Sequence, residues 1–168
     1  VLYNSLLLDQ MKNPNFENIL IITNNTKHYL LLNKTFEEFK EADQQLLWCK
    51  SVKEIPQINF DCVIIAIEST DHEIISITKN LNQQFGKIPI IILTSKVDLA
   101  STDNLLDHEI EDVLLMENLD KFQFHKALSL AYRKSNPKKS CLREKESCKH
   151  QLNYSSHNLY KVLFNESS

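Results

Sequence analysis

The sequence predicts an α/β domain built on a doubly wound, five-stranded parallel sheet of strand order 2-1-3-4-5, with a helical extension at its C-terminus. Two observations predict this fold class. Five short apolar runs are present, and most of them are continuous rather than alternating, as strands covered by helices on both faces require. Apolar residues at helical spacing lie between these runs, so strands and helices alternate along the chain. Right-handed crossovers between parallel strands then favour the order 2-1-3-4-5.

The five predicted strands follow one another along the first two thirds of the chain. They are ILIIT (19–23), LLWC (46–49), CVIIAI (62–67), IPIIILT (88–94) and DVLLM (112–116). The carboxyl ends of parallel strands meet at one edge of a sheet, where ligands and chemistry gather in this fold. The residues that follow each run are therefore the candidate site.

Helices are predicted between the strands and after the last one. Ser51 with Glu54 and Thr70 with Glu73 match capping boxes, and Pro56 keeps the helix after Ser51 short. LASTDNLLDHE (99–109) predicts a further short helix. Three apolar stripes recur at helical spacing: Tyr29, Leu32, Phe36 and Phe39; Ile74, Ile77, Leu81 and Phe85; and Phe124, Leu128 and Ala131.

Composition and charge exclude several classes of function. The 168 residues suffice for one domain and a tail, and the net charge of -3 gives no sign of nucleic-acid binding. No apolar run approaches the ~20 residues that span a bilayer, and no secretory signal pattern is present. We therefore expect a cytoplasmic fragment of a longer protein, with no membrane and no direct nucleic-acid partner.

The four cysteines do not match a metal site. Cys49 and Cys62 lie in apolar runs and are interpreted as core residues, whereas Cys141 and Cys148 lie in a charged segment near His150. That segment lacks the close CxxC or HxxxH pairs that present two ligands to one metal ion. We therefore expect no metal and no cofactor.

A nucleotide-binding function is excluded by the glycine content. SKVD (95–98) directly follows a predicted strand and is similar to the guanine-reading NKxD element of GTPases. Phosphate-binding loops need glycines so that backbone amides can close on the phosphates, and the chain has one glycine, Gly86. SKVD is therefore interpreted as an ordinary polar loop.

The ends of four predicted strands carry a pattern of their own. They read ILIITNN, FDCVIIAIEST, IPIIILTS and DVLLMENLD. In order and spacing they resemble the motifs ILVVDDD, YDLVLLDLxMP, xPIIxLTA and DYLxKPxD of the phosphoacceptor receiver domains of bacterial response regulators. The resemblance runs from Asn18 to Lys134 and implies the same five-stranded fold.

Most chemical groups of a receiver are replaced in this chain. In that family a strand-three Asp accepts a phosphoryl group, strand-one acids hold magnesium, a strand-four hydroxyl contacts the phosphoryl group and a strand-five Lys pairs with it. By resemblance, the nucleophile position falls on Ala66, and the acids fall on Thr23 and Asn24. The hydroxyl falls on Thr94 and the lysine on Met116. Of these groups, the hydroxyl of Thr94 alone is kept.

These replacements predict a pseudo-receiver with no catalytic residues. A methyl group cannot act as a nucleophile, so no aspartyl phosphate forms at Ala66. Thr23 and Asn24 offer neutral oxygens where magnesium is usually held through carboxylates. Met116 removes the cation that would neutralise a phosphoryl group.

Glu68 provides an alternative phosphoacceptor or metal ligand. It lies two residues after Ala66, so on a continuing strand its carboxylate would point to the same side. The simpler interpretation is a solvent-facing acid just before the predicted helix cap at Thr70. We favour the simpler interpretation, because catalytic groups need placement within about half an ångström.

The C-terminal residues 135–168 are predicted to form a linker and a signalling helix. Pro137 and a run of charges are typical of a linker between domains. Residues at an alternating four-three spacing then indicate a two-stranded coiled coil: Cys148, Leu152, Ser155, Leu159 and Val162. A single amphipathic helix packed on its own domain is the alternative.

The last residues, HNLYKVLFNESS, indicate the start of an output domain in the same chain. They are similar to the approach into a PAS sensory domain. They also resemble the LFRSLVGxS entry into the ATPase domain of sigma-54 activators, with Asn165 at the glycine position. The predicted organisation is thus an N-terminal extension (1–17), a receiver-like domain (18–134) and the linker with its helix (135–168).

Together these features predict a non-catalytic pseudo-receiver. We expect it to form a homodimer and to hold a downstream domain in register within a bacterial two-component or cyclic-dinucleotide regulator. Three alternatives stay open: a degenerate receiver of a sigma-54 activator, a switch phosphorylated on Glu68, and a monomer that docks a regulatory protein partner.

Overall fold

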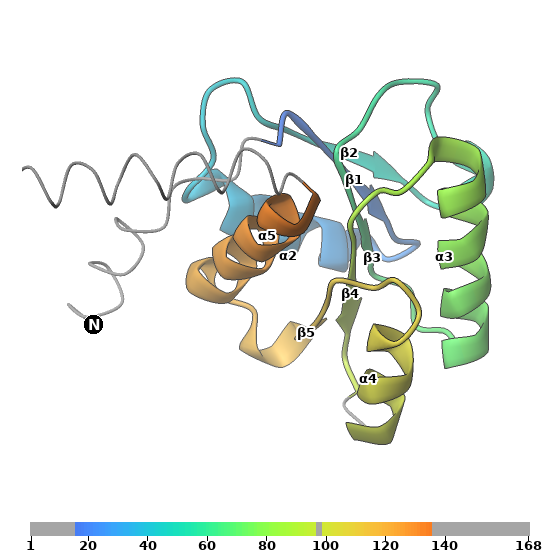
Figure 1. Ribbon diagram of the computed structural model, residues 1–168. Helices are drawn as coiled ribbons and strands as arrows, with labels where there is room; N and C mark the ends of the chain where they lie inside the picture. The colour runs from blue at the N-terminus through green and yellow to red at the C-terminus, as the bar shows by residue number, and fades with distance from the viewer. Residues whose placement is uncertain (1–15, 97–98, 136–168) are drawn as a thin grey trace, which may run out of the picture. The chain divides into compact units, whose positions relative to one another are not determined.

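The computed structural model describes residues 16–96 and 99–135. Predictions for residues 1–15, 97–98 and 136–168, the coiled-coil seam among them, lie outside the described residues. The elements, shown in Figure 1, are β1 (Asn18–Ile22), α2 (Thr26–Glu37), β2 (Gln45–Cys49), the 3-10 turn η1 (Val52–Glu54), β3 (Cys62–Ile65), α3 (Asp71–Phe85), β4 (Ile90–Thr94), α4 (Leu99–Leu106), β5 (Asp112–Leu115), the 3-10 turn η2 (Met116–Asn118) and α5 (Lys121–Ser135).

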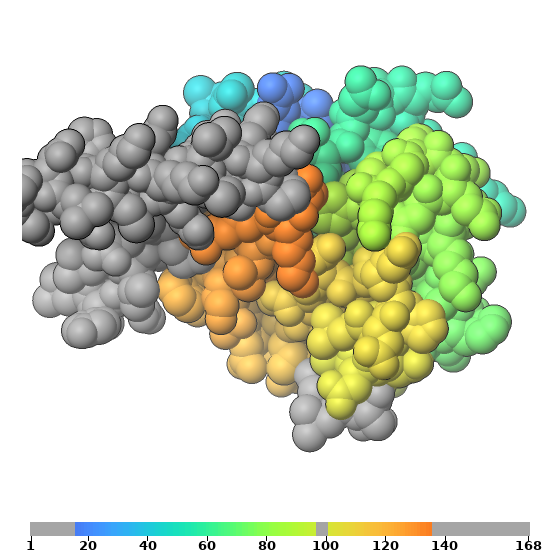
Figure 2. Space-filling view, in the orientation of Figure 1, coloured from blue at the N-terminus to red at the C-terminus, as the bar shows by residue number. Residues whose placement is uncertain are grey.

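The five strands form one parallel sheet of order β2-β1-β3-β4-β5, so the predicted fold class and strand order are confirmed. In Figure 1, α2 and α5 lie on one side of the sheet, and α3 and α4 lie on the other. In the space-filling view of Figure 2, α5 lies to the left, and α3 and α4 lie to the right. This arrangement explains why the strands are apolar along their whole length.

β1 shows how each strand fills both layers of the core. Ile19 and Ile21 pack into the apolar cluster shared with α2 and α5, whereas Leu20 and Ile22 pack into the cluster shared with α3 and α4. All four side chains are fully buried. Burial of an aliphatic side chain of this size contributes about 1.5–3 kcal/mol. The strand therefore ties the two helical layers to one sheet.

The described helices are short, and one side of each supplies the core. In α3, for example, Ile74 and Leu81 are buried, whereas His72 and Lys79 are exposed. Among the helices of the described residues, none combines the length and the apolar content needed to cross a membrane.

Each strand differs from its predicted range by one or two residues at one end or both. β1 and β2 each begin one residue earlier than predicted, and β1 ends at Ile22 rather than at residue 23. β3 was expected to reach residue 67 but ends at Ile65, because its pairing with β1 stops at the Ile22 and Ile65 pair. β5 ends at Leu115, where η2 begins, and β4 begins at Ile90 rather than at residue 88. Strand ends depend on the neighbouring strand, which a local apolar run does not report.

The two predicted capping boxes have different outcomes. At α3 the box is confirmed: Thr70 Oγ1 accepts from the Glu73 N–H at 3.4 Å, and the Glu73 carboxylate accepts from the Thr70 N–H at 3.1 Å. The box at Ser51 is wrong, because the segment forms a three-residue 3-10 turn with no side-chain cap. Glu54 instead accepts from the Lys50 N–H at 3.4 Å. The prediction that this segment is short is confirmed.

Candidate functional site

The carboxyl edge of the sheet brings together most of the positions predicted from the receiver resemblance. Ile22 pairs with Ile65, so Thr23 and Ala66 follow on adjacent strands. Thr94 pairs with Leu115, and the next residue along that strand is Met116. Asn24 follows Thr23 on the exposed turn before α2. The fold therefore assembles the predicted positions at one edge of the sheet.

Thr23 is fully buried and its polar groups bond within the protein. Its N–H donates to the Cys49 carbonyl at 3.1 Å, and its own carbonyl accepts from the indole N–H of Trp48 at 3.0 Å. Its Oγ1 accepts from the Asn25 N–H at 3.1 Å. The hydroxyl therefore shapes the turn into α2, because Asn25 is the residue that caps this helix.

Ala66 is 1% exposed and anchored to β1, since its N–H donates to the Ile22 carbonyl at 2.9 Å. His28, on the first turn of α2, approaches Ala66 from the neighbouring helix. The Nδ1 atom of His28 is 3.5 Å from the Ala66 carbonyl oxygen, a long contact. The imidazole therefore approaches the backbone at the position that the receiver resemblance assigns to the phosphoacceptor.

The tautomer of His28 follows from its two neighbours. Its Nε2 atom is 3.2 Å from Asn25 Nδ2, and the Asn25 Oδ1 atom already accepts from the Lys27 N–H at 2.9 Å. Because the amide nitrogen only donates and the Ala66 carbonyl only accepts, Nε2 accepts and Nδ1 carries the proton. His28 was missed by sequence reasoning. Its three-residue spacing from the N-cap Asn25 is the one local signal that places it beside the strand end.

Thr94 and Glu68 lie beside an open groove of about 620 Å³ between the strand ends, α3 and α4. The Thr94 Oγ1 accepts from the Lys96 N–H at 3.2 Å, a local turn contact. Glu68 is exposed and lies beyond the end of β3, where it accepts from Ser95 Oγ at 3.0 Å. The carboxylate is thus held towards the loop after β4.

Met116 is half-buried and begins η2 immediately after β5. It packs against the apolar cluster shared with α2 and α5. An apolar side chain in this place contributes contact area and carries no charge that could pair with a phosphoryl group.

The side chains at this edge do not fit a magnesium ion. Within residues 16–96 and 99–135, no three His, Cys, Asp or Glu side chains gather closely enough to hold a metal. Thr23 is committed to the turn before α2, and Glu68 bonds Ser95. Magnesium is usually held through one or two carboxylates. We therefore assign no metal chemistry to this edge.

The thiols of the two cysteines in the described domain are expected to be unreactive. Burial raises the pKa of the Cys49 thiol to about 11, and burial raises the pKa of the Cys62 thiol further still. Both lie in the core, as predicted. A thiol that stays protonated at neutral pH is a poor nucleophile and a poor metal ligand.

Comparisons with known proteins support the fold. No family model matches the chain, and no curated protein matches its sequence. Solved structures do match. A receiver domain protein (CheY-like) from Methanospirillum hungatei aligns with a TM-score of 0.59 and 11% identity, covering 73% of this chain and 98% of that one.

Two further structures show the range of proteins with this fold. The receiver domain of a sensor histidine kinase from Pseudomonas aeruginosa, with a magnesium ion in its active-site cleft, aligns with a TM-score of 0.54 and 15% identity, covering 69% of this chain and 97% of that one. A protein described as a CpaE2 pilus assembly protein from Sinorhizobium meliloti aligns with a TM-score of 0.56 and 14% identity, covering 68% of this chain and 98% of that one. The described part of this chain is thus a receiver-like domain in its fold.

Proposed function

We propose that the domain is a pseudo-receiver: a non-catalytic signalling and dimerisation module that is not phosphorylated at the usual position. The observation that carries this proposal is Ala66. It directly follows β3 with a buried methyl group, and the Nδ1 atom of His28 is 3.5 Å from its carbonyl oxygen. A methyl group offers no oxygen for phosphoryl transfer.

The surroundings of Ala66 support the same proposal. Thr23 uses its hydroxyl to shape a turn, and Met116 packs on the core where a receiver needs a cation. The fold also occurs in proteins described as pilus assembly components, so a function through protein contacts is compatible with the scaffold. We therefore assign the domain a role in binding protein partners rather than in catalysis.

The Glu68 alternative is tested by intact mass measurement after incubation with acetyl phosphate and magnesium. We expect no added phosphoryl mass on the wild-type chain, because Glu68 is exposed and bonded to Ser95, and the described residues form no metal site beside it. A phosphoryl adduct that disappears in Glu68→Gln contradicts the proposal. Ser95→Ala is the matched control, since it frees the Glu68 carboxylate without removing it.

The dimerising part of the proposal extends to the trailing helix predicted over residues 135–168. Its seam residues, Cys148, Leu152, Leu159 and Val162, lie outside the described residues. Light scattering on the full chain and on a chain that ends at residue 138 measures the contribution of this helix. We expect the shorter chain to dimerise more weakly. A monomer in both cases supports the alternative of a monomeric docking domain.

A further inference from the structure

β2 is an edge strand of the sheet, and within residues 16–96 and 99–135 no strand lies on its outer side (Figure 1). The Gln45 N–H and the Cys49 carbonyl both bond towards β1. Hydrogen-bonding direction alternates along a strand, so the backbone groups of Leu46 and Trp48 point away from β1. Among the described residues, the N–H and carbonyl groups of Leu46 and Trp48 therefore have no neighbouring strand to pair with. They lie in the position where a further strand would add.

This edge lacks the features that usually prevent strands from pairing. The five residues of β2, QLLWC, contain no charge and no proline, and the pairing with β1 runs without a bulge. Trp48 is 36% exposed although it is large and apolar. It stacks on Tyr29 with ring centroids 4.7 Å apart, so its ring is held in one orientation. The edge is therefore an ordered apolar surface that can accept a strand.

We propose that two copies of this chain dimerise by pairing their β2 strands antiparallel, about a two-fold axis at Leu47. This inference rests on the proposed dimerising function and names its interface. Leu46 then lies opposite the partner's Trp48, and their outward backbone groups form hydrogen bonds in both directions. The two five-stranded sheets become one continuous sheet across the axis.

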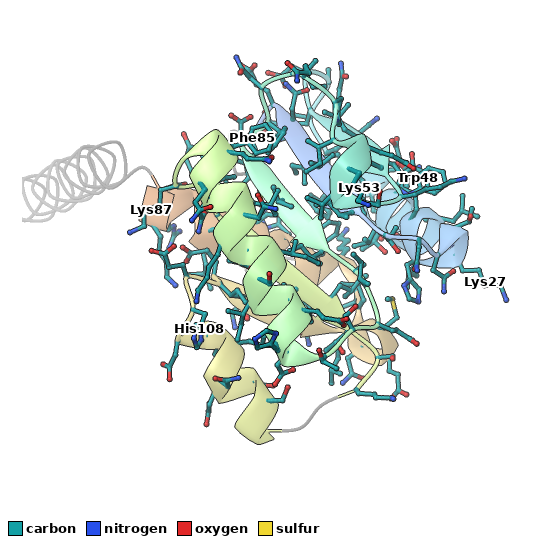
Figure 3. The ribbon with its side chains drawn as sticks, turned by 90° about the vertical axis from the view of Figure 1, so that its right-hand side faces the viewer. Lys27, Trp48, Lys53, Phe85, Lys87 and His108 are labelled. Atoms are coloured by element: carbon teal, nitrogen blue, oxygen red, sulfur yellow. The ribbon has the colours of Figure 1, made fainter. Side chains whose placement is uncertain are left out.

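The charges at the two ends of β2 favour a second copy of the chain as the occupant. Residues 37–43, before β2, carry four acids and one lysine, and residues 50–54, after it, carry two lysines and one acid. Asp43 and Lys50 are exposed at these two ends, and Figure 3 labels Lys53 on the same side of the domain as Trp48. Antiparallel pairing places the acidic end of each strand beside the basic end of its partner.

A charge exchange tests this interface without disturbing the core. Light scattering at ~100 μM is expected to give about twice the chain mass of 19.6 kDa for the wild type. Lys50→Glu places like charges together at both ends, so the dissociation constant should rise at least ~10-fold. The double variant Asp43→Lys with Lys50→Glu restores opposite charges and should restore the dimer. Because both residues are exposed, loss of folding does not explain this pattern.

A disulfide tests the register. Leu47 faces the partner's Leu47 across the axis with Cα atoms about 4.5 Å apart, within the range that a disulfide spans. Leu47→Cys should therefore cross-link on mild oxidation in a chain that also carries Cys141→Ser and Cys148→Ser. Ile58→Cys is the control, because Ile58 is apolar and 47% exposed but does not belong to β2. This variant should not cross-link.

Three results overturn the inference: a wild-type monomer at this concentration, a dimer that is indifferent to Lys50→Glu, or no cross-link through Leu47→Cys. The acetyl phosphate measurement is independent of all three. A dimer through another surface with no phosphoryl adduct rejects the β2 interface and keeps the pseudo-receiver. A dimer that passes the β2 tests but carries a phosphoryl adduct rejects the pseudo-receiver and keeps the β2 interface.

Discussion

Thr23 and Thr94 make the same local hydrogen bond at two strand ends but differ in burial. Each Oγ1 accepts from the N–H two residues later, at 3.1 Å for Asn25 and 3.2 Å for Lys96. Thr23 is fully buried, whereas Thr94 is half-buried. We expect Thr23→Val to lower the free energy of unfolding by about 1–3 kcal/mol, because it leaves a donor unpaired away from water. Thr94→Val should cost less than about 1 kcal/mol, since water can replace its hydroxyl. Urea unfolding measures both, and equal losses contradict the explanation.

At the same scale, the side chains of the candidate site were only partly predictable. Ala66, Thr94 and Met116 could be placed at the sheet edge from the order and spacing of the apolar runs. The contact between His28 and Ala66 could not, because it joins α2 to β3 across 38 residues of sequence and depends on how the helix packs on the sheet. No local pattern encodes such a contact.

The helix caps allow a test at the scale of single elements. Thr70→Ala removes a capping box that the structure contains, and we expect a loss of about 1 kcal/mol in the free energy of unfolding. Ser51→Ala changes a residue of the same kind that makes no side-chain cap, so its effect should stay within about 0.5 kcal/mol. Chemical denaturation of the two variants side by side makes the comparison. A Ser51→Ala loss as large as that of Thr70→Ala is the contrary result.

The elements themselves were predictable because two physical patterns are strong in this chain. Continuous apolar runs such as CVII can be stable only with cover on both faces, which fixes a parallel sheet with helices on each side. The short turn η1 is the exception. Its Ser51 and Glu54 match a helix start, yet Pro56 follows too closely for a helix to continue. Pro56 thus predicted the short length correctly, but the predicted side-chain cap at Ser51 did not form.

At the scale of the described domain, the fold of a receiver is present, and we propose that its chemistry is not. The sheet order, the two apolar layers and the common edge are kept, since they depend on apolar patterning over the whole length of the domain. Phosphoryl transfer depends on a few side chains at that edge, and Ala66 and Met116 are not suited to it. Under the proposed function, the domain acts through its surfaces rather than through a reaction.

His125 links the stability of the whole domain to pH. It lies on α5 at 1% exposure, with its ring edge-on to Phe39 at 5.1 Å, and burial lowers its pKa below the ordinary value of 6.5. The unfolded chain therefore binds a proton more readily than the folded one. The contribution of neutral His125 to the free energy of unfolding is fully present above the ordinary pKa of a histidine. It falls as the pH drops through that value towards the lower pKa of the folded state.

We expect the free energy of unfolding to fall between about pH 7.5 and pH 5.5, in the range where histidines titrate. Most of this fall should be absent in His125→Gln, because that side chain gains no charge in the interval. His72→Gln, at an exposed position on α3, is the matched control and should keep the wild-type slope. Urea unfolding at several pH values gives the slopes. Glutamine cannot take up the proton that His125 binds on unfolding. If His125→Gln loses stability on acidification as steeply as the wild type, a group other than His125 causes the pH dependence.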